Sequence, residues 1–205
     1  YLQKNREVQM IQMNKWAIRG SIHTGYQESM LGIMKWIKDN SPNKIIQLGT
    51  GSGVVTFLMA QYLYDTNPNG KIKAYDWWDD SSDGFHIFSM DDFEFSYRNQ
   101  PKELQNIIEY EKLDYRKWLD NPDTDWDMIY LDLNNDGEKI EKIYDVLKDK
   151  VLDEGKVIFF EGGTDGRFNK EAYKGRKKFS EMKDIPYKVY SVGIKSFGVI
   201  SREFI

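Results

Sequence analysis

Three glycines at alternate positions, directly between a strand-like and a helix-like segment, constrain this 205-residue chain more than any other feature. The β-type residues 45–48 lead into Gly49, Gly51 and Gly53, and residues 54–60 then continue as a mostly apolar helical pattern. Glycines let the backbone turn sharply and approach a ligand closely. The N-terminus of the helix offers unpaired N–H groups to whatever lies over the turn. The pattern predicts the nucleotide-binding turn of an α/β domain.

The spacing of these glycines separates two kinds of nucleotide ligand. The dinucleotide fingerprint Gly-x-Gly-x-x-Gly needs a glycine where this chain has Val54, and no Lys-Ser/Thr pair follows to make a phosphate-binding P-loop. The Gly-x-Gly-x-Gly turn resembles motif I of the class I S-adenosylmethionine (SAM)-dependent methyltransferases, which implies that it lies under the methionine part and ribose of SAM. The implied cofactor contacts are Gln47, Gly49, Thr50, Gly51, Ser52 and Gly53. Gln47 departs from the acid that the family commonly has at this position, so it brings no charge.

Strand-like and helix-like segments alternate along most of the chain. The strand candidates before the tail are residues 44–48, 71–76, 107–111, 127–132 and 156–161. Alternation of this kind makes a parallel sheet with right-handed crossovers. The tail differs, because it contains two consecutive strand-like segments, residues 187–192 and 197–201. We therefore expect a Rossmann-like, doubly wound α/β fold with a mostly parallel seven-stranded sheet and a C-terminal antiparallel hairpin.

The length of the chain corresponds to one domain with a full hydrophobic core. Helical patterns at residues 7–18 and 30–37 precede the first strand. We expect a single methyltransferase-like domain over residues 1–205, with an N-terminal helical cap (1–42) and a Rossmann-like core (43–205).

Two acids and a tryptophan that follow the next strands fit the adenosine part of SAM. Asp76 ends the second strand, and the carboxyl ends of neighbouring parallel strands meet at one edge of a sheet. In the family, the carboxylate at this position binds both ribose hydroxyls, Trp77 would stack on adenine, and Asp114 would meet the adenine amino group. The alternatives are that Asp76 merely ends its strand, Trp77 belongs to the core, and Asp114 is a solvated turn acid.

Two later segments, residues 126–137 and 152–163, resemble the small-molecule O-methyltransferases, in particular the cephalosporin-hydroxylase-like branch. That branch can hold a divalent cation such as Mg²⁺ between acids that end the fourth and fifth strands. Here those acids are Asp132 and Glu161, helped by Asp136 or Asn135. The sequence departs from the metal-dependent pattern, because Gly162 follows where those members carry a polar residue. Asp132 has the alternative roles of holding the SAM ammonium group or the substrate, or of acting as general base.

Both histidines, His23 and His86, fall in predicted loops. An imidazole with a near-neutral pKa is a natural base for a hydroxyl proton, and in the family the region of His23 usually folds over SAM. The candidate catalytic residues are therefore Asp132 and His23, although a surface histidine is the plainer alternative. The stretch from 79 to 97 is either a substrate lid or an oligomer contact, and the second case would make the protein a homo-oligomer.

Composition narrows the partners and the compartment. The net charge of −4 disfavours nucleic acid, and the basic run 174–178 is most simply a solvated helix face. The chain has no cysteine, which excludes disulfides and thiolate chemistry. We found no transmembrane-length apolar run and no signal-peptide core, so we expect a cytoplasmic protein without a membrane partner.

The expected function is SAM-dependent methyl transfer to a hydroxyl of a small molecule or a glycan. Two alternatives from other classes stay open. One is a non-catalytic SAM- or nucleotide-binding module, which would keep the glycine turn and Asp76 without a working base. The other is a nicotinamide-dependent oxidoreductase, against which Val54 argues.

Overall fold

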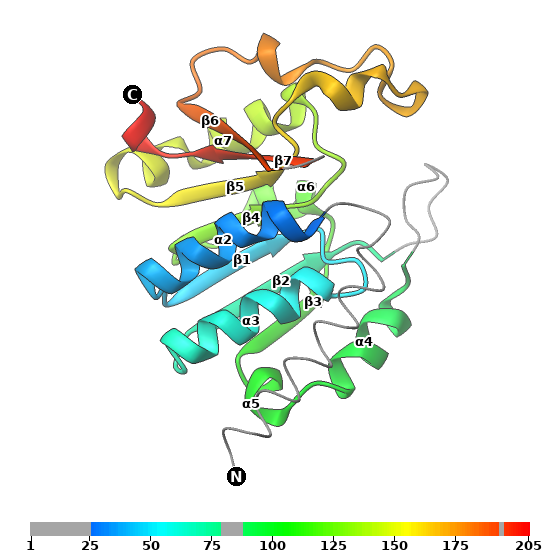
Figure 1. The fold of residues 1–205 in the computed structure, drawn as a ribbon, viewed down its shortest axis with the longest axis vertical. Helices are drawn as coiled ribbons and strands as arrows, with labels where there is room; N and C mark the ends of the chain where they lie inside the picture. The colour runs from blue at the N-terminus through cyan, green and yellow to red at the C-terminus, as the bar shows by residue number, and fades with distance from the viewer. Residues whose placement is uncertain (1–25, 79–87, 193–194) are drawn as a thin grey trace.

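The computed structural model describes residues 26–78, 88–192 and 195–205. Within them, seven strands form one sheet in the order β3-β2-β1-β4-β5-β7-β6 (Figure 1). The strands are β1 (Lys44–Leu48), β2 (Lys71–Asp76), β3 (Ile108–Lys112), β4 (Met128–Leu131), β5 (Val157–Glu161), β6 (Tyr187–Val192) and β7 (Lys195–Ile200). The first five strands pair in parallel, whereas β7 is antiparallel to both β5 and β6. This arrangement confirms the predicted parallel sheet with a terminal hairpin.

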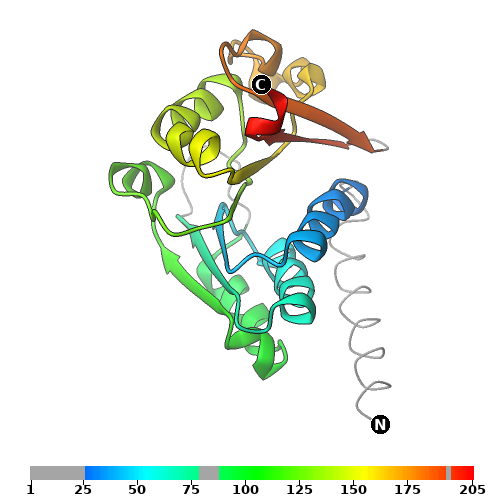
Figure 2. The ribbon, with the colours of Figure 1, turned by 90° about the vertical axis from the view of Figure 1, so that its left-hand side faces the viewer.

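Helices cover both faces of the sheet. They are α2 (Tyr26–Asn40), α3 (Val54–Thr66), α4 (Met90–Arg98), α5 (Lys102–Gln105), α6 (Tyr115–Asp120) and α7 (Gly137–Asp153). Figure 2 shows α2 and α3 on one side of the sheet and α7 on the other. Strand β4 illustrates how alternation builds two cores: Met128 and Tyr130 pack with α2 and α3, while Ile129 and Leu131 pack with α7. Helix α7 thus covers the second of these cores.

The described part of the predicted helical cap is α2. Its residues Ile33 and Ile37 are fully buried in the core that α3 shares. The predicted leading helix at 7–18 lies outside the described residues. Across the described part of the chain, no helix combines the length and the apolar character needed to cross a lipid bilayer.

The segment between β2 and β3, expected as a lid or an oligomer contact, is helical in its described half. A capping box starts α4: the Ser89 hydroxyl accepts from the Asp92 N–H, and the Asp92 carboxylate accepts from the Ser89 N–H. Phe93 of this helix is fully buried, with its ring centre 5.2 Å from that of Trp78. The helix is thus fixed against the end of the sheet. Residues 79–87 lie outside the described residues.

The segment between β5 and β6 contains three short 3₁₀ turns, η1 (Asp165–Asn169), η2 (Glu171–Tyr173) and η3 (Phe179–Glu181). The interpretation of the basic run 174–178 as a solvated helix face is wrong, because the run links η2 to η3 as a turn. Its cations pair with acids of the α7 region: Lys177 with Glu141 and Arg176 with Asp136. These ion pairs tie the segment to α7.

The carboxylate of Asp123 helps to fasten the loop before β4 to the sheet. It accepts a 2.7 Å hydrogen bond from the Tyr75 hydroxyl, and the ammonium groups of Lys73 and Lys44 lie 3.6 and 3.8 Å from its oxygens. Burial by itself raises the pKa of the Asp123 carboxyl, but the Tyr75 hydrogen bond and the two ammonium groups hold that pKa below its usual range. Burial raises the pKa of Tyr75 to about 12, so its hydroxyl remains a donor.

Replacement of the Asp123 carboxylate should make the free energy of unfolding less dependent on pH in the acidic range. Because the folded-state pKa is depressed, the stabilisation is present above about pH 4, the pKa of an unfolded aspartate, and is lost as the pH falls through the lower folded-state value. Asp123→Asn should lower the free energy of unfolding at pH 7 by about 1–3 kcal/mol. Urea unfolding at pH 7 and pH 3 measures this, with the exposed Asp120→Asn as control. An equal loss at both pH values would contradict the account.

Candidate functional site

The glycine turn lies at the carboxyl end of β1 and is pressed against the end of β4. Gly49 and Gly53 have φ angles of 88° and 86°, which favour glycine. A Cβ on Gly49 would lie 2.0 Å from the carbonyl oxygen of Asp132, and one on Gly53 would lie 2.6 Å from the Phe57 ring. Gly53 has no side chain with which to cap α3, so the first-turn N–H groups are left to solvent or a ligand. Ser52, between the glycines, is half-buried.

Gln47 supports the turn from inside the protein. Its side chain is 1% exposed; Nε2 donates to the carbonyl oxygen of Gly49 (3.0 Å), and Oε1 accepts from the Thr56 hydroxyl (2.7 Å). An acid at this position could not donate to the Gly49 carbonyl. The need for a donor therefore explains the glutamine in place of the family's acid. Gln47 thus fixes the shape of the turn.

The Asp76 carboxylate connects the end of β2 to the glycine turn. Oδ2 accepts hydrogen bonds from the backbone N–H groups of Thr50 (2.6 Å) and Gly51 (2.8 Å), and Oδ1 accepts from the N–H of Trp78 (3.0 Å). The Thr50 hydroxyl donates to the carbonyl oxygen of Tyr75. Asp76 thus does more than end its strand, because it fixes the backbone path of the turn.

The two adjacent tryptophans have different environments. Trp78 is 4% exposed, has a left-handed φ of 43°, and donates from Nε1 to the carbonyl oxygen of Gly51 (2.8 Å). Trp77 is 37% exposed, and the Arg116 guanidinium lies 5.2 Å from its ring centre. Asp114 caps α6 and pairs with Arg116, whose hydrogen bonds hold the pKa of that carboxyl below its usual range. Trp77 and Asp114 therefore lie on the same rim, joined by one arginine, and the Asp114 side chain is only 11% exposed.

The Glu161 carboxylate at the end of β5 pairs with a guanidinium group. Arg167 donates from Nη2 to the Glu161 carboxylate and from Nη1 to the carbonyl oxygen of Asn135 (3.0 Å). Asp132 is close enough to raise the pKa of both Arg167 and Tyr173. Burial is the largest cause of the raised pKa of Tyr173, whose hydroxyl therefore stays protonated at neutral pH.

The three acids expected to hold a divalent cation do not form a metal-binding group. In the described part of the chain, no group of three His, Cys, Asp or Glu side chains could hold a metal ion. Glu161 pairs with Arg167, while Asp136 caps α7 and lies 3.4 Å from Arg176. Guanidinium groups thus stand beside two of the three predicted ligands.

Some site residues escaped the sequence analysis, and others lie beyond the described chain. His23 and His86 are outside the described residues, so His23 stays a prediction. Trp78, Arg167 and Tyr173 were missed. The adjacent Trp77 is a signal that could have pointed to Trp78, but Arg167 follows Glu161 by six residues in an irregular segment and carries no local signal.

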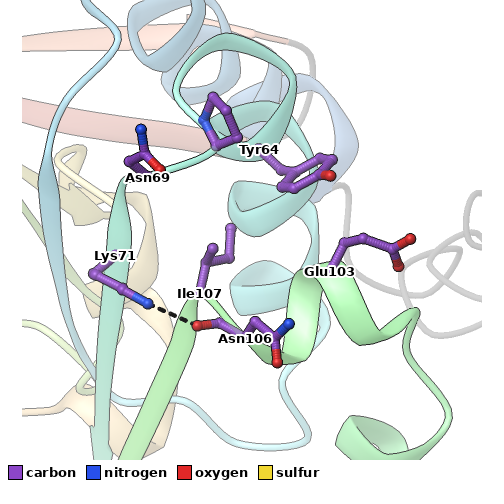
Figure 3. Close-up of a pocket in the computed structure, with 7 residues that line it drawn as sticks. Tyr64, Asn69, Lys71, Glu103, Asn106 and Ile107 are labelled. Atoms are coloured by element: carbon purple, nitrogen blue, oxygen red, sulfur yellow. Dashed lines mark hydrogen bonds between the residues drawn. The ribbon is translucent and has the colours of Figure 1, made fainter.

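A small pocket of about 260 Å³ lies at the opposite edge of the sheet, where β2 begins (Figure 3). Its lining residues are Tyr64, Pro68, Asn69, Lys71, Glu103, Asn106 and Ile107. The Lys71 ammonium group already donates to the carbonyl oxygen of Asn106 (2.8 Å). Because open α/β sheets bind ligands at the carboxyl ends of their strands, we do not assign the functional site to this pocket.

Gln47→Glu should weaken the glycine turn. The carboxylate cannot donate to the partly buried Gly49 carbonyl, which then loses its partner, so we expect a loss of about 1–3 kcal/mol in the free energy of unfolding. Urea unfolding measures this loss. A double-mutant cycle with Thr56→Val should show non-additive losses, because both side chains belong to one network. Additive losses, or a variant as stable as the wild type, would contradict the proposed role of the amide.

Comparison with known proteins shows the fold through solved structures of low sequence identity. No protein-family model matches the sequence, and no curated protein matches it either. Solved structures match at low identity. The O-methyltransferase TomG from Streptomyces achromogenes, involved in tomaymycin synthesis and solved with SAM, is 13% identical, with a TM-score of 0.58 over 84% of this chain and 78% of that chain.

Two further solved structures lead to the same result. Cofactor-bound Rv0187 from MTB is 14% identical, with a TM-score of 0.60 over 86% of this chain and 80% of that chain. A methyltransferase from Geobacter sulfurreducens is 10% identical, with a TM-score of 0.61 over 93% and 89%. Together with the strand order, these similarities show that the chain has the fold of the class I SAM-dependent O-methyltransferases.

Proposed function

We propose that this chain is a SAM-dependent methyltransferase that methylates an oxygen of a small molecule. The observation that carries the proposal is the junction of the glycine turn with two acidic residues. Asp76 accepts hydrogen bonds from the turn on one side, and the Asp132 backbone packs against Gly49 on the other. This junction lies at the carboxyl ends of β1, β2 and β4, where open α/β sheets bind ligands. TomG, which shares the fold, was solved with SAM.

We assign the ribose of SAM to Asp76. A carboxylate has about four lone-pair positions. The N–H groups of Thr50, Gly51 and Trp78 already use Asp76 as acceptor, so capacity remains for one ribose hydroxyl. Binding of both hydroxyls, as the family resemblance implies, requires the carboxylate to give up a backbone partner when SAM enters.

We assign the adenine to the rim formed by Trp77 and Asp114. The exposed indole of Trp77 offers a flat apolar surface, one face of which meets the Arg116 guanidinium. Adenine therefore stacks on the other face or displaces Arg116. The lowered pKa of Asp114 keeps its carboxylate ionised at neutral pH, as an acceptor for the adenine amino group.

Methyl transfer asks the protein mainly to align the reactants, because the sulfonium is already activated. A lone pair of the acceptor oxygen forms the bond to the methyl carbon, while the carbon–sulfur bond breaks and its electron pair goes to sulfur. The products are the methylated acceptor and S-adenosylhomocysteine. The hydroxyl proton passes to a base, for which Asp132 is our first candidate and His23 the second. The methylated hydroxyl belongs either to a small molecule or, as an alternative, to a glycan.

The experiment that tests this function separates binding from chemistry. Calorimetric titration should show saturable binding of SAM and S-adenosylhomocysteine. Asp76→Asn should weaken SAM binding by at least about tenfold, or about 1.4 kcal/mol, because its amide group replaces an acceptor of the turn N–H groups with a donor. Asp65→Asn, an exposed change at the far end of α3, is the matched control.

The same proteins, incubated with methyl-labelled SAM and panels of hydroxylated small molecules and glycans, test catalysis. Asp132→Asn should retain SAM binding and lose methyl transfer. Tight SAM binding without transfer to any acceptor would favour a binding module instead. Saturable binding of NAD, without binding of SAM, would contradict the proposed function and favour the oxidoreductase.

A further inference from the structure

Arg167 occupies the junction of β4 and β5 at which the sequence predicted a divalent cation. Its guanidinium donates to the Glu161 carboxylate and to the carbonyl oxygen of Asn135. The guanidinium carbon lies 5.2 Å from the ring centre of Tyr173 and 5.7 Å from that of Phe179. Two hydrogen bonds and two aromatic rings thus fix both the position and the plane of this cation.

The surrounding backbone is shaped to admit the guanidinium group. The side chains of Arg167 and Glu161 are only 12% and 13% exposed. A Cβ on Gly162 would lie 2.7 Å from Nη2 of Arg167, so the glycine directly after β5 makes room for the ion pair. Burial by itself lowers the pKa of the guanidinium, but the Glu161 charge and hydrogen bond, with smaller effects of Tyr173 and Asp132, raise it. The cation is therefore permanent.

The oxygen groups at this junction do not suit a divalent cation while Arg167 is in place. The Glu161 carboxylate is engaged by the guanidinium. The Asn135 amide donates from Nδ2 to the carbonyl oxygens of Leu131 and Glu161, both at 3.0 Å, which fixes its orientation. Its Oδ1 is buried with no hydrogen-bond partner among the described residues. Removal of the guanidinium would leave the Glu161 carboxylate as a hard oxygen donor, which Mn²⁺ accepts, at a junction that also holds Asn135 and Asp132.

We propose that Arg167 is the resident cation of this site and that the chain needs no divalent metal there. The role in methyl transfer rests on the proposed function, whereas the occupation of the acidic junction by Arg167 does not. A fixed guanidinium supplies positive charge beside the reacting groups without a coordination bond, and it favours the anionic form of a nearby oxygen. Arg167 is in this sense a positioning residue for Glu161.

Titration of the intact chain with Mn²⁺, followed by electron paramagnetic resonance, tests the proposal without SAM or an acceptor. Wild-type protein should bind Mn²⁺ only weakly. Arg167→Ala should bind one Mn²⁺ at least about tenfold more tightly, and the added change Glu161→Gln should abolish that gain. Arg98→Ala is the matched control for loss of an arginine, because Arg98 is exposed and pairs with Glu94 on α4. Arg167→Gln, a smaller disturbance of the packing, should show the same gain if the alanine variant fails to fold.

Two outcomes would overturn the proposal. One is a stoichiometric Mn²⁺ site in the wild type that Glu161→Gln removes. The other is the absence of any gain in both folded Arg167 variants. The rate of methyl transfer by the wild type should be the same with and without EDTA. A rate that falls in EDTA and recovers when Mg²⁺ is added would contradict metal independence. If the protein does not bind SAM, the proposed function is contradicted, but the conclusion drawn from Mn²⁺ binding is unaffected.

Discussion

The hydrogen bonds from the backbone of Thr50 and Gly51 to the Asp76 carboxylate hold the functional edge of this fold together. They join the end of β1 to the end of β2 at 2.6 and 2.8 Å, in a region where Asp76 is only 8% exposed. A buried carboxylate is costly unless it is hydrogen-bonded. The third bond, from the N–H of Trp78, and the nearby N-terminus of α3 supply the remaining compensation.

Two other contacts fix the same turn from different directions. Gln47 links it to Thr56 of α3, and the close approach of Gly49 to the Asp132 carbonyl links it to the end of β4. Elements from three strands and one helix thus determine a single short loop. A ligand over this loop meets a surface that is already shaped, which lowers the ordering cost of binding.

Much of the fold could be predicted because its determinants are local. The residue ranges predicted for β1, β2 and β6 are the same as those in the structure. The range predicted for β7 is shifted toward the C-terminus relative to the observed strand. The glycine turn and Asp76 were also found, since their spacing follows from strand order. The function of Gln47 was not, because its partners come from two other elements.

The part of the site away from the glycine turn could not be predicted either, because there too the contacts join residues from different elements. Arg167 meets Glu161 only through the irregular path of the segment after β5, and no periodicity specifies that path. Which of the two tryptophans is buried likewise depends on the left-handed backbone of Trp78 and on the position of α4. In both cases the strand end could be predicted, but not the second residue that lies there.

The central claim is that SAM binds over the glycine turn with its sulfur directed toward the end of β4. A crystal structure of the complex with S-adenosylhomocysteine tests it most directly. We expect a ribose hydroxyl within hydrogen-bonding distance of Asp76 and the thioether sulfur facing Asp132. A ligand bound elsewhere, such as the pocket beside Lys71 and Asn106, would contradict it.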